Sequence, residues 1–229
     1  MNDEVQLKEV ERFLTLFKAD WTDVMSCPAL ATFKTNTYNK PDELPSTEDL
    51  IKLKNYTEKR LIDLGKQLKI NPTYELWRSL SEVVLTRLLV FNKRRASEPA
   101  KLELLQFKNR PNWRNTSSKE LIDNLQPLEK MLMKRMDLIQ VPGKRNRRVP
   151  ILITPEVGNA MKLLMDTRNQ CGISIKNKYF FATNSDDGYL NTWLVLNNHS
   201  KAAGVSKPRL ITSCKLRKYV ATLAQVQIS

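Results

Sequence analysis

Apolar residues recur every three or four positions along most of the sequence, the spacing that places side chains on one face of an α-helix. Residues 3–18 show this spacing first, with Val10, Phe13 and Phe17. A second, shorter helix is predicted over residues 21–33. The polar, proline-bearing stretch TNTYNKPDELP then predicts a linker.

Two longer helices are predicted after the linker. Ser46 or Thr47 can cap the first, LPSTEDLIKLKNYTEKRLIDLGKQL, through a side-chain oxygen. Pro72 lies near the start of the second, NPTYELWRSLSEVVLTRLLVF, where a missing N–H is tolerated. The tryptophans are interpreted as core residues, because their large rings gain most from burial: Trp21, Trp77, Trp113 and Trp193.

The next part of the chain combines helix with strand. Helix is predicted for residues 117–135, with a break near Pro127. Asp137–Val141 and Val149–Ile153 are short, β-favouring apolar runs on either side of a basic turn that contains Gly143. This pattern predicts a β-hairpin.

The C-terminal part is predicted to be mostly helical. KYFFAT, residues 178–183, is a candidate short strand. Three helices are predicted. The first has Thr154 as its cap and Pro155 at its first position. The second, in GYLNTWLVLNNHSKAAG, ends at Gly204, and the third covers TSCKLRKYVATLAQVQ. Together the elements predict a mainly α domain with a small antiparallel β-sheet, an α+β fold.

Length and composition restrict the class of protein. The 229 residues allow one large domain or two small ones, and 41% hydrophobic residues can bury a core. No stretch approaches the roughly 20 apolar residues of a membrane span. The charged, helical N-terminus does not resemble a secretory signal. A membrane partner is therefore not expected.

The cysteines and the single histidine argue against a metal site. Cys27, Cys171 and Cys214 are widely spaced and odd in number, which favours free thiols in a reducing compartment. No zinc-ligand spacing is present, and His199 cannot complete one. We expect no metal and no cofactor, and we interpret His199 as a surface residue of a helix.

The net charge of +14 is unevenly distributed. Residues 1–90 hold 13 Lys and Arg against 14 Asp and Glu, residues 91–148 hold 15 against 6, and residues 149–229 hold 10 against 4. A neutral N-terminal third followed by a strongly basic remainder indicates a polyanionic partner, most simply nucleic acid. The alternative is a basic protein kept soluble by solvated lysines.

Three basic motifs could bind phosphate. Arg95 follows a buried helix, and Glu98 could hold its guanidinium as a fixed fork of donors for two phosphate oxygens. The alternative is a helix C-terminus whose dipole is complemented by basic residues. In VPGKRNRRVP, a Gly-Lys turn could push Lys144 into a groove, where it binds phosphate or donates a proton. The alternative there is a solvated basic hairpin on a DNA backbone.

The third motif is TSCKLRKYVAT. Arg217 lies in the first turns of an otherwise apolar helix, so it either faces solvent or points at an anion near the helix start. By itself this motif is weak. The order of the three motifs along the chain is more informative.

This order resembles the catalytic domain of the tyrosine recombinase, or phage-integrase, family. That family uses an Arg, a Lys, a His-x-x-Arg motif, a later His or Trp, and a Tyr nucleophile. The resemblance implies that Arg95 and Arg217 are the two arginines, that Glu98 supports the first, and that Lys144 is the hairpin lysine. Cys214 stands where the family has its histidine.

The resemblance covers roughly residues 45–226 and implies a domain division. Residues 1–40 resemble the end of a helical core-binding domain plus a linker, and residues 41–229 a catalytic domain truncated before the tyrosine. Tyr219 lies two residues after Arg217, so it does not match that nucleophile. KLRKYVATLAQV is closer to recombinases of eukaryotic mobile elements, such as the Crypton and DIRS types.

The resemblance implies a nuclear protein that acts on double-stranded DNA and is inactive alone. Self-association on DNA is left open, as is whether the chain is an enzyme. Arg95, Lys144 and Arg217 are expected to converge in one basic groove. Further DNA contacts are expected from Lys93, Arg94, Arg145, Arg147, Arg148, Lys215 and Lys218. The alternatives are a non-enzymatic DNA- or RNA-binding regulator and, less favoured, a protein-interaction domain with a basic surface.

Overall fold

The computed structural model describes residues 2–36, 38, 43–110 and 126–228. The chain divides into two units, Met1–Glu43 and Leu44–Ser229, here called unit 1 and unit 2. The expected identities of residues 1–40 and 41–229 as parts of two recombinase domains stay predictions.

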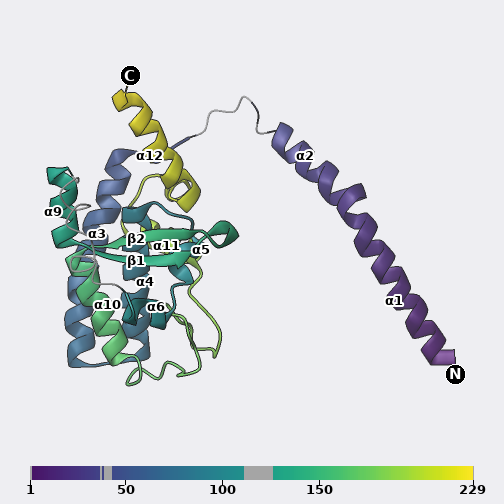
Figure 1. Cartoon of the computed structure of the whole chain (residues 1–229), viewed down its shortest axis with the longest axis horizontal. Coiled ribbons are helices and arrows are strands. Elements are labelled where there is room, and N and C mark those ends of the chain that lie inside the picture. The colour runs from purple at the N-terminus through teal and green to yellow at the C-terminus, as the bar shows by residue number, and fades with distance from the viewer. Residues whose placement is uncertain (1, 37, 39–42, 111–125, 229) are drawn as a thin grey trace. The chain divides into compact units, whose positions relative to one another are not determined.

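The described residues of unit 1 are almost entirely helical. The unit consists of α1 (Asn2–Trp21), a π-helical segment (Thr22–Ser26) and α2 (Cys27–Thr35), which confirms both predicted N-terminal helices (Figure 1). Trp21 is 46% exposed, so its interpretation as a core residue is wrong. The physical reason is that the described part of this unit has no second layer for the ring to pack against.

Two long helices, α3 (Thr47–Ile70) and α4 (Tyr74–Asn92), begin unit 2 and pack against each other. The Ser46 hydroxyl caps α3 by accepting the N–H of Asp49 at 3.1 Å, and the Thr73 hydroxyl caps α4 in the same way. These caps confirm the two predicted helices. Pro72 lies just before the cap of α4 rather than inside its first turn.

The other elements of unit 2 follow in chain order. They are α5 (Ser97–Ala100), α6 (Leu104–Lys108), α9 (Pro127–Arg135), β1 (Asp137–Pro142), β2 (Arg148–Ile153), α10 (Pro155–Thr167), α11 (Thr192–Ala202) and α12 (Ser213–Ile228). The predicted helix over residues 117–125 lies outside the described residues, whereas its continuation after Pro127 is confirmed as α9.

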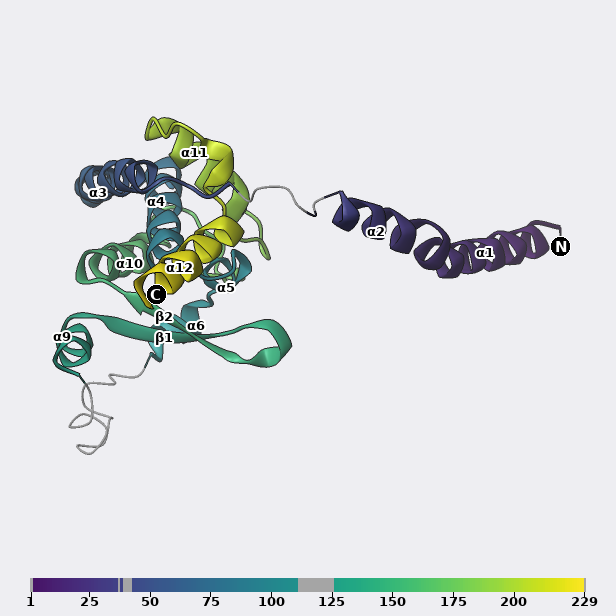
Figure 2. The same cartoon turned by 90° about the horizontal axis from the view of Figure 1, so that it is seen from above.

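The predicted hairpin is present. β1 and β2 pair antiparallel, from Asp137 opposite Ile153 to Pro142 opposite Arg148. Ile139 and Ile151 are opposite each other and both buried, so one face of this ribbon joins the core. Figure 1 and Figure 2 both show the hairpin beside α5 and α6. Unit 2 is thus mainly α with a two-stranded antiparallel sheet, as the sequence predicted.

The predicted strand at residues 178–183 is wrong. This run forms only isolated bridges, Tyr179 with Glu103 and Ala182 with Tyr189. Phe180 and Phe181 are fully buried, so the β-favouring composition reflects packing into the core rather than pairing in a sheet. Arg168 fixes the loop, because its guanidinium donates to the carbonyl oxygens of Asn177 and Tyr179.

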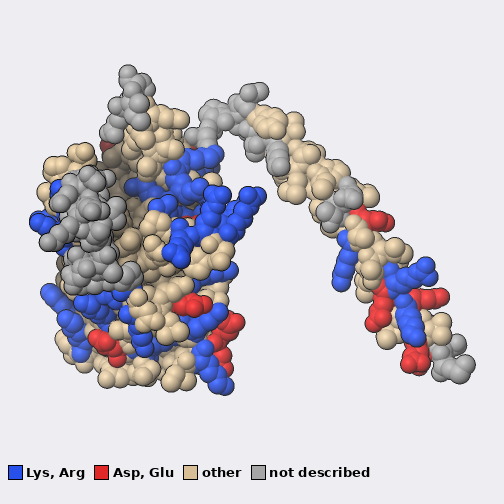
Figure 3. All heavy atoms as spheres, in the orientation of Figure 1, with Lys and Arg blue, Asp and Glu red and all other residues tan. Residues whose placement is uncertain are grey.

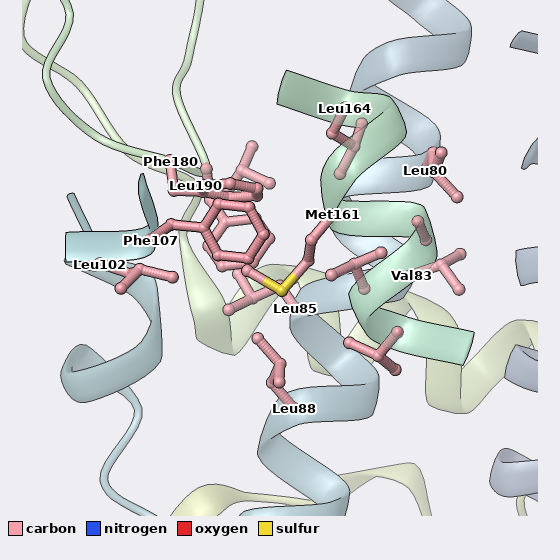
Figure 4. Close-up of a cluster of buried hydrophobic side chains, with 14 of the residues drawn as sticks. Leu80, Val83, Leu85, Leu88, Leu102, Phe107, Met161, Leu164, Phe180 and Leu190 are labelled. Carbon is pink, nitrogen blue, oxygen red and sulfur yellow. The ribbon is translucent and has the colours of Figure 1, made fainter. Parts of the chain in front are cut away.

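The main core lies between α4, α10, the hairpin and this loop. Figure 4 shows side chains of α4 such as Leu85 close to Met161 of α10 and to the rings of Phe107 and Phe180. A second cluster joins α3, α11 and α12 and consists of Leu53, Leu196, Val205, Ile211 and Leu216. This second cluster fixes the start of α12 relative to α3.

The tryptophans of unit 2 differ in burial. Trp77 is 1% exposed, and its indole N–H donates to the carbonyl of Leu164 at 2.8 Å. Trp193 is 63% exposed in the first turn of α11, so the core interpretation is wrong for it. The buried side chains of α11 are Thr192, Val195, Leu196, His199 and Ser200, and Trp193 is not among them. Trp113 lies outside the described residues.

His199 is also not where the sequence predicted it. It is 9% exposed, with its ring tilted at 48° to that of Tyr56 and Nε2 4.0 Å from a Glu82 carboxylate oxygen. Burial lowers the pKa of His199 below its ordinary value of 6.5, with Glu82 opposing this shift and Arg60 adding to it. The imidazole is therefore kept neutral inside the fold.

We expect the stability of the protein to fall as the pH decreases below about 6.5, because the unfolded state then binds a proton that the native state does not. The free energy of unfolding should change by at most about 1.36 kcal/mol per pH unit for this one group. Urea unfolding of the full chain between pH 5 and 7.5 measures this slope.

His199→Gln should flatten the slope in that range, since the chain has one histidine. A slope unchanged in His199→Gln would show that other groups cause it. The carboxylate of Asp49 titrates in a separate window, because its pKa is lowered, chiefly by the backbone N–H of Ser206.

Candidate nucleic-acid interface

The loop after α4 presents Arg95 at the surface. Lys93, the residue directly after α4, adopts a left-handed conformation with φ of 48° and turns the chain sharply. Glu98 is 5% exposed, and one carboxylate oxygen accepts the backbone N–H of Arg95 at 3.0 Å. The other oxygen lies 3.5 Å from Arg95 Nη1, while 48% of the arginine side chain stays exposed. Glu98 therefore fixes both the loop and one side of the guanidinium.

The turn of the hairpin, residues 143–147, is tight and lies close to the loop that carries Arg95. The N–H of Gly143 donates to the carbonyl of Arg147 at 2.7 Å, and Arg145 and Asn146 have positive φ. A Cβ on Gly143 would collide with the side chain of Val149 and would lie 3.4 Å from a Glu98 carboxylate oxygen. Glycine is thus required where the turn passes α5, and the basic turn is held against the Arg95 loop.

These two segments form one basic cavity. Arg95, Lys144, Arg145 and Arg147 line a cavity of about 280 Å³, here called the arginine-lysine pocket. All four side chains are exposed. Positive groups gathered in this way repel one another, and an anion in the pocket would relieve that repulsion. Figure 3 shows Lys and Arg side chains gathered around the hairpin turn and the start of α12.

Arg217 belongs to a neighbouring element. It is exposed near the start of α12, which Leu216 anchors in the second cluster. Figure 1 and Figure 2 both place the first turns of α12 beside α5. Among the described residues that line the arginine-lysine pocket, Arg217 is not included. The structure thus brings two of the three expected residues, Arg95 and Lys144, into one cavity.

The remaining residues expected to contact DNA are placed around this region. Arg94, Arg148, Lys218 and Cys214 are exposed, while Lys93 and Lys215 are half-buried. Tyr219 lies on α12, and its hydroxyl is 2.7 Å from the Thr47 hydroxyl at the start of α3. That contact holds the Tyr219 hydroxyl at the start of α3, and Tyr219 is not among the described residues that line the arginine-lysine pocket.

Sequence reasoning missed a second, mostly apolar groove of about 390 Å³ between α3 and α4. Its lining residues are Thr47, Leu50, Ile51, Lys54, Thr57, Arg87, Val90, Phe91 and Lys93. Ile51 on α3 was a possible signal, since it is an exposed apolar residue between Leu50 and Lys54 in the sequence of that helix. Among the described residues, no group of three or more His, Cys, Asp or Glu side chains is placed to hold a metal ion. None of the described helices is long and apolar enough to cross a membrane.

Comparisons by sequence give no match. None of the family models matches this chain, and none of the curated proteins is similar to it in sequence.

Solved structures are similar to this chain in fold. The site-specific recombinase XerH bound to its difH substrate, a pre-cleavage complex, has a TM-score of 0.50 and 16% identity, over 82% of this chain and 43% of that one. XerH bound to palindromic difH, a post-cleavage complex, has a TM-score of 0.49 and 16% identity, over 78% and 41%. XerA recombinase has a TM-score of 0.42 and 16% identity, over 85% and 54%.

The chain spans less than half of the XerH structures that it matches. At this identity the likeness to the pre-cleavage complex concerns the fold alone. The chain therefore has a mainly α fold with a small antiparallel sheet like that of a tyrosine recombinase catalytic domain.

Proposed function

We propose that this chain is a recombinase-like protein that binds double-stranded DNA and holds a backbone phosphate in the arginine-lysine pocket. The observation that carries the proposal is that Arg95, Lys144, Arg145 and Arg147 line one cavity, with Glu98 bonded to Arg95. A guanidinium held by a buried carboxylate offers its remaining N–H donors in a fixed geometry suited to phosphate oxygens. The likeness in fold to a recombinase whose structure holds its substrate supports DNA as the polyanion.

The chemical roles in this proposal follow the resemblance of the motifs. Arg95 and Arg217 neutralise the non-bridging oxygens of one phosphate, where charge increases as the phosphate is attacked. Lys144, on the hairpin turn, donates a proton to the leaving oxygen. Arg145, Arg147 and Arg148 bind the flanking backbone without reading sequence.

Binding of a fluorescent duplex to the full chain at several salt concentrations tests the proposal. The logarithm of the affinity should fall linearly with the logarithm of the salt concentration, by about 0.9 per phosphate neutralised. Arg95→Ala should reduce that slope by about 1. Arg95→Lys keeps the charge but loses the fork, so it should lower affinity with the slope retained. Absent binding at low salt, or binding that does not change with salt, would exclude the proposal.

We further propose that residues 1–229 form no covalent link to DNA by themselves. None of the described tyrosines lines the arginine-lysine pocket, and Tyr219 is engaged with Thr47. Cys214 takes the place of the family's histidine, and a thiol is a weaker hydrogen-bond donor than an imidazolium.

Incubation with suicide duplexes that carry a nick near candidate sites, followed by denaturing gels, should therefore give no protein–DNA adduct. An adduct would contradict this prediction. Its loss in Cys214→Ala or in Tyr219→Phe would identify the residue responsible, and Tyr189→Phe serves as a matched control in the described part of the chain.

A second candidate function is a non-enzymatic regulator that binds DNA or RNA with a basic face. It is favoured by the position of Arg217 outside the set of residues that line the arginine-lysine pocket. A double-mutant cycle of Arg95→Ala and Arg217→Ala on duplex affinity separates the two. Residues that hold the same phosphate should couple by more than about 0.5 kcal/mol, whereas residues on a merely basic face should act additively.

The proposal also includes an origin in a eukaryotic mobile element of the Crypton or DIRS type, self-association on DNA, and a nuclear location. The segment KLRKYVATLAQV, which makes up most of α12, supports the origin. The net charge of +14 supports a location where DNA is the main polyanion. Imaging of the tagged full chain tests the location.

A further inference from the structure

Unit 1 carries an apolar stripe that its own residues leave uncovered. Leu7, Val10, Leu14, Phe17 and Trp21 follow one another at alternating spacings of three and four residues along α1. They are 44% to 61% exposed. The rings of Phe17 and Trp21 have centroids 5.2 Å apart and are tilted at 41°, so these two side chains lie next to each other along the stripe. This spacing is the repeat of a helix that pairs with another helix through the a and d positions of a heptad.

We infer that this stripe pairs antiparallel with α1 of a second copy of the chain. With Leu7, Leu14 and Trp21 at a, and Val10 and Phe17 at d, the four residues from Val10 to Trp21 are complementary to the same four residues of a second copy in the reverse direction. Leu14 of one copy faces Phe17 of the other, and Val10 faces Trp21, each contact occurring twice about a two-fold axis. A large side chain is then always opposite a smaller one, which suits packing of knobs into holes.

The charges that flank the stripe favour the same arrangement. Glu11 and Lys18 both occupy e positions, which face each other across an antiparallel pair. In the register that pairs Leu14 with Phe17, Glu11 of each copy lies opposite Lys18 of the other. In a parallel pair the e positions would face Gln6 and Phe13 at g, which offer no opposite charge. Charge complementarity thus selects both the partner and its direction.

The helix itself is long enough for this role. The 20 residues of α1 extend over about 30 Å. A helix in water gains most of its stability from packing of its apolar face. Pairing with a second copy covers that face without requiring any other chain.

Analytical ultracentrifugation of the full chain without DNA, at low salt and over a range of concentrations, tests the inference. We expect a reversible dimer. Glu11→Lys should raise the dimer dissociation constant by about tenfold or more, since two attractive pairs become two repulsive ones. Lys18→Glu should do the same. Glu9→Lys, a matched charge reversal on the outer face of α1, should leave the constant unchanged.

Mixing the two single variants gives the decisive result. A Glu11→Lys chain and a Lys18→Glu chain restore opposite charges at both contacts, so their mixture should dimerise as the unmodified chain does. A monomer at every concentration, a dimer insensitive to Glu11→Lys, or a mixture that stays monomeric would overturn the inference. Circular dichroism of each variant checks that α1 remains helical. Because DNA is absent, the result is independent of the proposed function.

Discussion

Duplex binding should be lost almost completely in the variant Arg147→Glu with Arg148→Glu. Both side chains are exposed at the end of the hairpin turn, and Arg147 lines the arginine-lysine pocket. The change replaces two positive charges by two negative ones, so two phosphate contacts are lost and repulsion is added. A carboxylate at position 147 would also compete with phosphate for the guanidinium of Arg95.

We expect the affinity for duplex DNA at low salt to fall by about 100-fold or more, and the salt slope to decrease by about 2. Fluorescence anisotropy with several unrelated duplexes measures both, and the loss should be similar for all of them, because backbone contacts carry no sequence information. Thermal unfolding should be unchanged, since the substituted side chains are in solvent.

The matched control is Lys66→Glu with Lys69→Glu. These lysines are exposed near the C-terminal end of α3, whereas the loop that carries Arg95 follows the C-terminal end of α4. The control changes the net charge by the same amount, but at the end of the α3–α4 pair that is opposite to the Arg95 loop. An equal loss of affinity in both variants would show that total charge, not the arginine-lysine pocket, determines binding.

Trp77→Ala should cause the largest loss of stability. The indole is 1% exposed in the main core, and its N–H donates to the Leu164 carbonyl of α10. The change leaves a cavity between α4 and α10 and a buried carbonyl without its donor. We expect the free energy of unfolding to decrease by about 3–5 kcal/mol, a large part of the roughly 5–15 kcal/mol that stabilises a typical domain.

Urea unfolding measures this decrease, with Trp193→Ala as the matched control. Trp193 is 63% exposed, so its removal should change the free energy of unfolding by less than about 0.5 kcal/mol. Equal losses in the two variants would contradict the burial described here for Trp77 and Trp193.

The sequence by itself determined the elements that depend on local chemistry. The capping residue Ser46 and the 3.6-residue periodicity predicted α3, and the periodicity after Pro72 predicted α4, because these signals act within a few residues. The hairpin could likewise be predicted, since β-favouring runs on either side of a glycine turn pair locally. The basic residues of the three motifs were also identified from the sequence, although their roles stay proposals.

Only the tertiary structure decided what each side chain faces. Trp77 and Trp193 are the same residue type, and each lies in the first turn of a helix. Trp77 is buried because α10 packs against α4, whereas Trp193 on α11 stays exposed. His199 is buried because α11 packs against both α3 and α4, which bring Tyr56 and Glu82 to it, and no local pattern in the sequence records these contacts. KYFFAT is β-favouring in sequence, but the loop anchored by Arg168 buries it without a strand partner.

The arginine-lysine pocket is the clearest case. Arg95 follows a helix and Lys144 lies in a distant hairpin, so their proximity depends on the docking of that hairpin against α5. From the sequence, Arg95, Lys144 and the turn glycine Gly143 could be identified, and this glycine permits the close approach of the hairpin turn to α5. The distance between them is fixed by long-range packing of apolar faces, whose partners are not encoded by spacing along the chain.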